Sequence, residues 1–187
     1  MGNASAADRA LFAAFEENAE VIAAEAEAAY ARRLGKETEA DLNLPERSPE
    51  RPTEEERTVW ARRMQSFFRA AVATSYEHRC AISGVALPEL LNASHIVPWS
   101  VDTRRRADPR NGILLNTLYD RAFDRGLITV DDSLRVRVSD RLRVDDPPPF
   151  HRRALLDIEG ASLRPACRFA PDPEALAYHR ERVFLSA

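Results

Sequence analysis

The sequence predicts an α+β protein, because helical patterns lie at both ends of the chain and short strand patterns lie between them. Residues 7–34 are rich in Ala and Glu, with apolar residues at steps of three, four or seven, which predicts one long helix. Residues 80–84 and 90–96 are short apolar runs around a turn, which predicts two strands. Residues 113–126 then predict a helix that ends at its last glycine.

The remaining elements are predicted on both sides of this central segment. Acidic residues after Thr53 resemble the first turn of a helix, which we expect to run to about Tyr76. Residues 127–130 and 134–138 alternate around a polar turn, which predicts a hairpin. Three consecutive prolines at 147–149 break the chain, and a last helix is expected over residues 172–184.

Two parts are expected along the chain. A length of 187 residues with 44% hydrophobic residues suits one domain with an appendage. Residues 1–52 are predicted to form an acidic helical arm and a Pro-rich linker, and residues 53–187 the main domain, with its core at about 79–126. The narrow apolar stripe of the arm should pack either on this domain or on a partner helix, which leaves a homodimer through the N-terminal helix as an alternative.

Charge is distributed unevenly. Residues 1–56 hold 14 acidic and 6 basic side chains, a net charge of −8, whereas residues 57–187 have a net charge of +5. A nucleic-acid partner for the basic part would explain this asymmetry. Ordinary variation along an Arg-rich chain explains it equally well, so charge alone does not decide the function.

The sequence lacks the signals of secretion and membrane insertion. No run of 18 apolar residues is present, and the first residues carry no basic region followed by an apolar segment. Cys80 and Cys167 form no CxxC pair. We therefore expect a reduced, cytoplasmic protein with no structural zinc site.

Three stretches within about thirty residues contain the side chains of a hydrolytic site. His95 lies near a predicted strand end, and a neutral imidazole can accept a proton from water near neutral pH. Asn111 precedes a glycine sixteen residues later, in a pair that favours a turn. Asp120 and Asp124 lie one helical turn apart, so their carboxylates share a helix face. Oxygen ligands of this kind suit Mg²⁺ or Mn²⁺ better than Zn²⁺.

The stretches 93–99, 108–112 and 119–126 together resemble the HNH, or ββα-metal (His-Me finger), motif of bacterial endonucleases. The resemblance extends over about residues 57–187 and implies a ββα-metal nuclease core with flanking helices. It implies metal-dependent hydrolysis of DNA phosphodiester bonds with one Mg²⁺ or Mn²⁺ ion per site, in a setting of restriction or defence against foreign DNA. By the same resemblance, His95 is the general base and Asn111 ties the loop and orients that histidine.

Two positions depart from the family pattern. Asp120 occupies the place where many members have a histidine ligand, and Ser94 the place where an aspartate often binds the metal. The expected metal ligands are therefore Asp120 and Asp124, with water and DNA phosphate completing the coordination. The alternative is a pair of solvated acids, with Asp124 paired to Arg121 or Arg125.

A basic cluster lies inside the motif, between the expected base and the expected metal ligands. Arg side chains match phosphate oxygens bidentately, and a cluster here would hold the DNA backbone. A solvated charge run is the alternative. The expected nucleic-acid contacts are Arg104, Arg105, Arg106 and Arg110.

Other chemically capable residues receive simpler interpretations. His78 and His179 are expected to be structural or surface residues, and Trp99 to pack against the small core of the motif. His151 lies beside two arginines, but nothing specific assigns it to nucleic acid.

Two rivals to an active endonuclease remain open from the sequence. One is a nucleic-acid-binding module that keeps the shape of the motif without cleavage, which Ser94 and Asp120 would permit. The other is a nuclease subunit regulated by a partner through the helical arm.

Overall fold

The structure is a computed structural model that describes Ile22, Ala26, Ala29 and Arg33, and then residues 54–186. These four residues of the predicted arm are helical, and the rest of the arm lies outside the described residues. Two compact units are distinguished. The first includes the chain up to Ala70 and the loop Asp102–Asp108, and the second consists of Ala71–Val101 and Pro109–Ala187. The proposed domain boundary near residue 52 remains a prediction.

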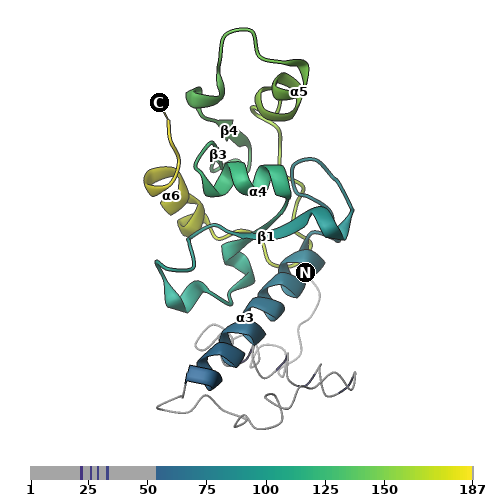
Figure 1. Ribbon diagram of the computed structural model, residues 1–187, viewed down its shortest axis with the longest axis vertical. Coiled ribbons are helices and arrows are strands. Elements are labelled where there is room, and N and C mark those ends of the chain that lie inside the picture. The colour runs from purple at the N-terminus through teal and green to yellow at the C-terminus, as the bar shows by residue number, and fades with distance from the viewer. Residues whose placement is uncertain (1–21, 23–25, 27–28, 30–32, 34–53, 187) are drawn as a thin grey trace. The chain divides into compact units, whose positions relative to one another are not determined.

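Two antiparallel strands and one helix form the centre of the second unit (Figure 1). Strand β1 (Leu91–His95) pairs with β2 (Gly112–Asn116), so that His95 lies opposite Gly112. Helix α4 (Thr117–Asp124) follows β2 directly and contacts both strands. This is a ββα unit, and the predicted α+β fold class is confirmed.

The positions of two predicted elements in this unit were wrong. Residues 80–84 form a turn, because the Gly84 N–H donates to the Cys80 carbonyl (2.9 Å) and the Cys80 N–H donates to Val85 (2.8 Å). These bonds satisfy the backbone locally, and Ala81 alone in this segment donates to β2, at Leu114 (2.7 Å). The second strand is residues 112–116, which had been predicted as the start of a helix.

This second error has a physical reason. Residues 112–115 are all buried, and a short continuous apolar run does not distinguish a buried strand from a buried helix. The helix begins after Asn116, whose side-chain oxygen accepts the Tyr119 N–H (2.9 Å). An Asn before a helical segment is a common N-cap, so the boundary was visible in the sequence.

The other elements predicted for residues 54–186 are present. Strands β3 (Ile128–Val130) and β4 (Val136–Val138) form the predicted hairpin. Helix α6 (Pro173–Arg182) begins at Asp172, whose carboxylate accepts the Glu174 N–H (2.9 Å). The remaining elements are α3 (Glu54–Ser75), α5 (Pro149–His151), a π-helical turn (Arg152–Leu156) and short 3-10 turns at Pro88–Leu90, Thr103–Arg105, Pro109–Asn111 and Asp140–Leu142.

No helix in the part of the chain that the structure describes is long and apolar enough to cross a membrane.

Gly126 joins the end of α4 to the end of α6. Its φ of +67° lies in the left-handed region, which ends the helix. A Cβ atom at this position would collide with the backbone carbonyl oxygen of Val183. The Gly126 carbonyl accepts the Leu185 N–H (2.9 Å), so the two segments touch through their backbones. Glycine is therefore required here for both conformation and space.

We expect Gly126→Ala to lower the free energy of unfolding by more than about 2 kcal/mol. The cost of a left-handed backbone at alanine and the cost of the collision between its Cβ and the backbone add together. Gly84→Ala is the matched control, since Gly84 has a φ of +73° but open space around its Cβ position. Gly84→Ala should lower the free energy of unfolding by only about 1 kcal/mol. Urea denaturation of the two variants measures the difference, and equal losses would contradict the close approach.

Candidate active site

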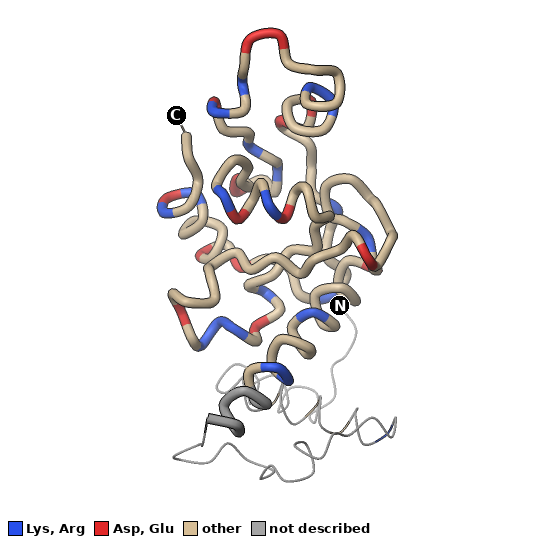
Figure 2. Tube along the Cα trace, viewed as in Figure 1, with Lys and Arg blue, Asp and Glu red and all other residues tan. Residues whose placement is uncertain are grey.

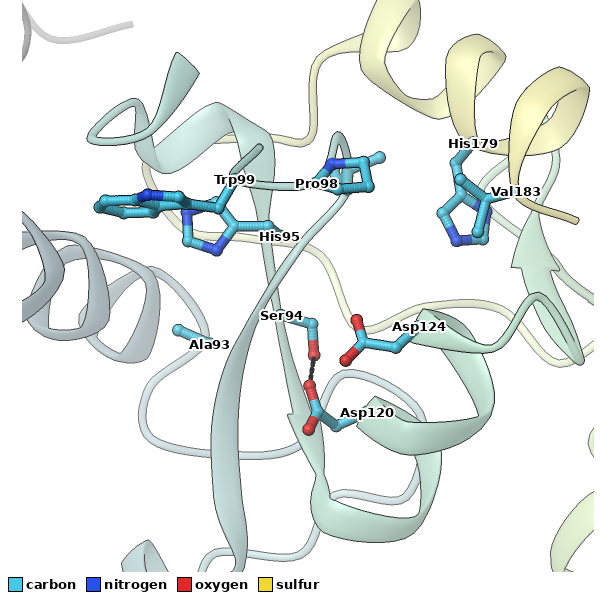
Figure 3. A pocket seen from close by; sticks show the side chains of 10 residues that line it. Ala93, Ser94, His95, Pro98, Trp99, Asp120, Asp124, His179 and Val183 are labelled. Atoms are coloured by element: carbon cyan, nitrogen blue, oxygen red, sulfur yellow. Dashed lines mark hydrogen bonds between the residues drawn. The ribbon is translucent and has the colours of Figure 1, made fainter. Parts of the chain in front are cut away.

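A pocket in the second unit is lined by residues from the end of β1, from α4 and from the end of α6 (Figure 3). His95, Asp120 and Asp124, three of the residues predicted from the sequence, all line it. The lining also includes Ser94, Trp99, His179 and Val183. The structure therefore brings the expected base and the two expected carboxylates to one cavity.

Asp120 is held by two side chains of β1. The Ser94 hydroxyl donates to Oδ1 (2.5 Å), and the Asn92 amide donates to Oδ2 (2.8 Å). Residues two apart on a strand share a face, so Asn92 and Ser94 both point at the helix. Each carboxylate oxygen has a donor, which fixes α4 to β1. Ser94 had been singled out only as a weak ligand, and Asn92 had been missed, although their spacing of two was a usable signal.

Asp124 lies one turn further along α4, in the pocket beside Asp120 (Figure 3). No residue in the described part of the chain donates a hydrogen bond to its carboxylate. Desolvation raises the pKa of Asp124, and the Asp120 carboxylate raises it further, against the lowering effect of Arg121 and Arg125. The pocket therefore contains two like charges, one anchored and one without a hydrogen-bond donor among the described residues.

His95 is the last residue of β1 and is half-buried. Its ring meets the Trp99 ring edge-on, with centroids 5.5 Å apart and an interplanar angle of 89°. Figure 3 shows the imidazole beside Trp99, while the Asp120 and Asp124 side chains lie together elsewhere in the pocket. Trp99 thus packs within the motif, as expected, and the residue that it packs against is His95.

Asn111 closes the loop that follows β1. It is 1% exposed, and its side chain accepts the Val97 N–H (2.8 Å) and donates to the Val97 carbonyl (3.1 Å). Its own carbonyl accepts the Ile96 N–H (2.9 Å). These bonds join Asn111 to the two residues directly after His95, and the role that the resemblance implied for Asn111 remains a prediction.

The predicted arginine contacts belong to both units of the chain. Arg104 and Arg105 pair with Asp102 at 3.4 and 3.6 Å, within the loop that belongs to the first unit. The residues that line the pocket all belong to the second unit. Arg110 is in the second unit, directly before Asn111, and its carbonyl accepts the Asp172 N–H (2.9 Å).

Two other arginines, which had been considered only as ion-pair partners of Asp124, flank it on α4. Arg121 and Arg125 are exposed and four residues apart, so they share a face of the helix. Acidic and basic residues alternate along this segment in Figure 2. Both arginines lower the pKa of Asp124, which places their charges near the pocket. Helical spacing could have identified them in the sequence.

His179 of α6 is a buried wall of the pocket. It is 1% exposed, its Nδ1 lies 2.8 Å from the Thr129 hydroxyl, and its Nε2 lies 3.1 Å from the Phe123 carbonyl oxygen. Its ring stacks on the Phe123 ring at 3.7 Å. Burial lowers its pKa to about 4, the hydrogen bond to Phe123 opposes this, and Arg180 adds to it. The structural interpretation of His179 is therefore correct, but its position beside the pocket had been missed.

The described residues contain no group of three or more His, Cys, Asp or Glu side chains that could hold a metal ion. The two carboxylates of α4 nevertheless fit a hard divalent cation. Both are oxygen ligands, and a cation would favour the ionised form of Asp124, whose pKa is raised by desolvation and then by the Asp120 carboxylate. Mg²⁺ commonly binds through one or two carboxylates and keeps several waters, so a site of two protein ligands is sufficient.

Comparison with known proteins gives one family match. The model of a family described as HNH endonuclease matches residues 80–131, which include His95, Asn111, Asp120 and Asp124. Residues 80–131 therefore form an HNH endonuclease domain. This confirms the resemblance drawn from the sequence.

The search of solved structures lists a chain described as a modification dependent TagI restriction endonuclease. It is 21% identical to this chain, with a TM-score of 0.45. The similarity covers 62% of this chain and only 37% of that one. No curated protein matches the sequence.

The low pKa of His179 predicts that the second unit loses stability in acid. Below pH 6.5 the unfolded chain binds a proton at this histidine that the folded chain excludes until about pH 4. The contribution of the neutral His179 to the free energy of unfolding is complete above pH 6.5 and is lost as the pH falls toward 4. Between pH 7 and 4.5, wild type should lose roughly 2 to 3 kcal/mol more of its unfolding free energy than His179→Gln.

Urea denaturation at the two pH values measures this difference. Carboxylates titrate in both proteins, so their contribution cancels in the comparison. An equal loss of stability in wild type and His179→Gln would contradict the buried, neutral state of the histidine.

Proposed function

We propose that this protein is a metal-dependent endonuclease that hydrolyses DNA phosphodiester bonds. The observation that carries the proposal is the pocket that His95 shares with Asp120 and Asp124, three residues that lie within the segment matched by the HNH endonuclease family. We propose a role in restriction or defence against foreign DNA, as the resemblance noted in the sequence implies. DNA is the proposed partner.

The proposed general base is His95. A neutral imidazole can take a proton from water near physiological pH, which hydrolysis requires. Its position at the end of β1 is supported by the hydrogen bonds between Asn111 and the following residues. The proposed role of Asn111 is therefore to fix the backbone that carries the base.

Asp120 and Asp124 are the proposed holders of a divalent cation, Mg²⁺ or Mn²⁺. Asp120 is oriented by Ser94 and Asn92, and Asp124 faces the pocket without a donor among the described residues. Such a cation supplies electrostatic stabilisation of the charge that develops on the phosphate oxygens.

The backbone of DNA requires cationic contacts. Arg104, Arg105, Arg106 and Arg110 stay proposed contacts on the basis of the sequence. We add Arg121 and Arg125, because both are exposed and their charges act on a carboxylate in the pocket. Contacts of this kind position the phosphate chain and read no bases.

One observation favours the rival function, a binding module without cleavage. Both oxygens of Asp120 already accept hydrogen bonds from β1, as they would if this residue were purely structural. The cleavage experiment separates the two functions.

We expect purified protein to nick supercoiled plasmid with Mg²⁺ or Mn²⁺ and to stop when EDTA is added. His95→Ala should lower the rate by at least about 100-fold, because general base catalysis is lost. His78→Asn is the matched control: His78 is exposed, is not among the pocket residues, and has a φ of +54° that asparagine tolerates. It should cleave at the wild-type rate.

Two other outcomes would contradict either the cleavage activity or the role of His95. A folded wild type that retains DNA in a gel shift but does not cleave would favour the binding module. Cleavage by His95→Ala at the wild-type rate would remove this residue from the mechanism.

Arg121→Gln and Arg125→Gln should each weaken DNA binding several-fold and reduce the slope of log K against log salt by about one unit. The rate at saturating DNA should change less. Arg137→Gln removes the same charge from a residue paired with Glu159 at 3.4 Å, and it serves as the control. Fluorescence anisotropy at several salt concentrations tests this, and an equal effect of all three substitutions would show a general effect of net charge.

A further inference from the structure

We infer that His179 is a positioning residue for Asp124: through its contacts with Phe123 it fixes the last turn of α4 and thereby the separation of the two carboxylates in the pocket. The inference rests on the proposed metal-dependent function, and it assigns to α6 a role in building the site.

The contacts of His179 are directed at the residue next to Asp124. The carbonyl of Phe123 is one of the last four of α4, which have no partner within the helix. It accepts the Gly126 N–H (2.8 Å) and lies 3.1 Å from Nε2 of His179. The two aromatic rings stack with an interplanar angle of only 11°. Both the backbone and the side chain of Phe123 are therefore held by one histidine.

The hydrogen bonds define the tautomer of His179. A carbonyl oxygen can only accept, so Nε2 carries the hydrogen and donates to Phe123. In the neutral ring Nδ1 then accepts, and the Thr129 hydroxyl donates to it (2.8 Å). Thr129 is 1% exposed and belongs to β3, so the ring is held from two elements.

The two carboxylates of the pocket thus have separate supports. Asp120 is fixed from β1 by Ser94 and Asn92, whereas Asp124 has no donor of its own among the described residues. Its position depends on the backbone of the last turn of α4. Since both carboxylates line one pocket (Figure 3), loosening that turn would change the separation of Asp124 from Asp120. The affinity for a divalent cation would then fall.

Helix α6 has anchors that do not involve the His179 ring. Arg180 donates to the Val130 carbonyl (3.0 Å) and pairs with Asp132 (2.5 Å). The Leu185 N–H donates to Gly126. A substitution of the imidazole should therefore leave α6 in place and remove mainly the support of Phe123.

The test is direct binding of Mn²⁺, measured by electron paramagnetic resonance of the free ion without DNA. His179→Phe keeps a stacked ring and removes both hydrogen bonds, and it should weaken Mn²⁺ binding roughly tenfold, as loss of a supporting contact behind a ligand commonly does. His179→Gln places an amide donor near the position of Nε2 and should restore affinity to within about threefold of wild type. Leu176→Ala is the control, because Leu176 is a buried residue of the same helix that contributes to stability without lining the pocket.

Each result supports or overturns the inference. Weaker binding by His179→Phe, with recovery in His179→Gln and no change in Leu176→Ala, supports it. Unchanged Mn²⁺ affinity in folded His179→Phe overturns it, and so does an equal loss in Leu176→Ala. If His179→Phe does not fold, Thr129→Val replaces it, since it frees one side of the ring; unchanged affinity in that variant also overturns the inference.

The proposed function can fail separately. A wild type that cleaves DNA and binds Mn²⁺, with variants of equal affinity, removes only the positioning role. A wild type that binds no Mn²⁺ contradicts the proposed metal site together with the positioning role that depends on it.

Discussion

The pairing of β1 with β2 is the constraint on which the site depends. The ladder sets His95 opposite Gly112, and the chain passes from β2 straight into α4 through the cap at Asn116. The same strand that ends in His95 also presents Asn92 and Ser94 to the Asp120 carboxylate. A slip of one residue in this register would turn those two side chains to the opposite face and separate the helix from the strand.

The two carboxylates in the pocket are not fully compensated by ion pairs with basic side chains in the part of the chain that the structure describes, so their electrostatics depend on where they are placed. Desolvation and then the Asp120 carboxylate raise the pKa of Asp124, and Arg121 and Arg125 compensate only partly, since this pKa remains raised. Such an arrangement is costly in an ordinary folded surface and is useful where a cation or a phosphate chain has to be bound. In such a site the neighbouring basic side chains would both stabilise the carboxylate and attract the phosphate.

Much of the site could be predicted from the sequence because the spacing of its residues is local. His95, Asn111, Asp120 and Asp124 fall within about thirty residues, and the pocket contains three of them. The assignment of Gly112–Asn116 failed because a buried apolar run has no distinguishing period. The position of His179 beside the pocket could not be predicted, since its partners Thr129 and Phe123 lie fifty and fifty-six residues away in the sequence. Contacts at that separation follow from tertiary packing, which a single sequence does not reveal.

The contacts of residues 183–185 determine when the pocket can form during synthesis of the chain. The Leu185 N–H bonds to Gly126, its carbonyl accepts the Ser139 hydroxyl, and Val183 lines the pocket. Synthesis proceeds from the N-terminus, so the ββα unit is made about sixty residues before these last contacts. The pocket therefore cannot reach its final form until residues 183–185 have been synthesised.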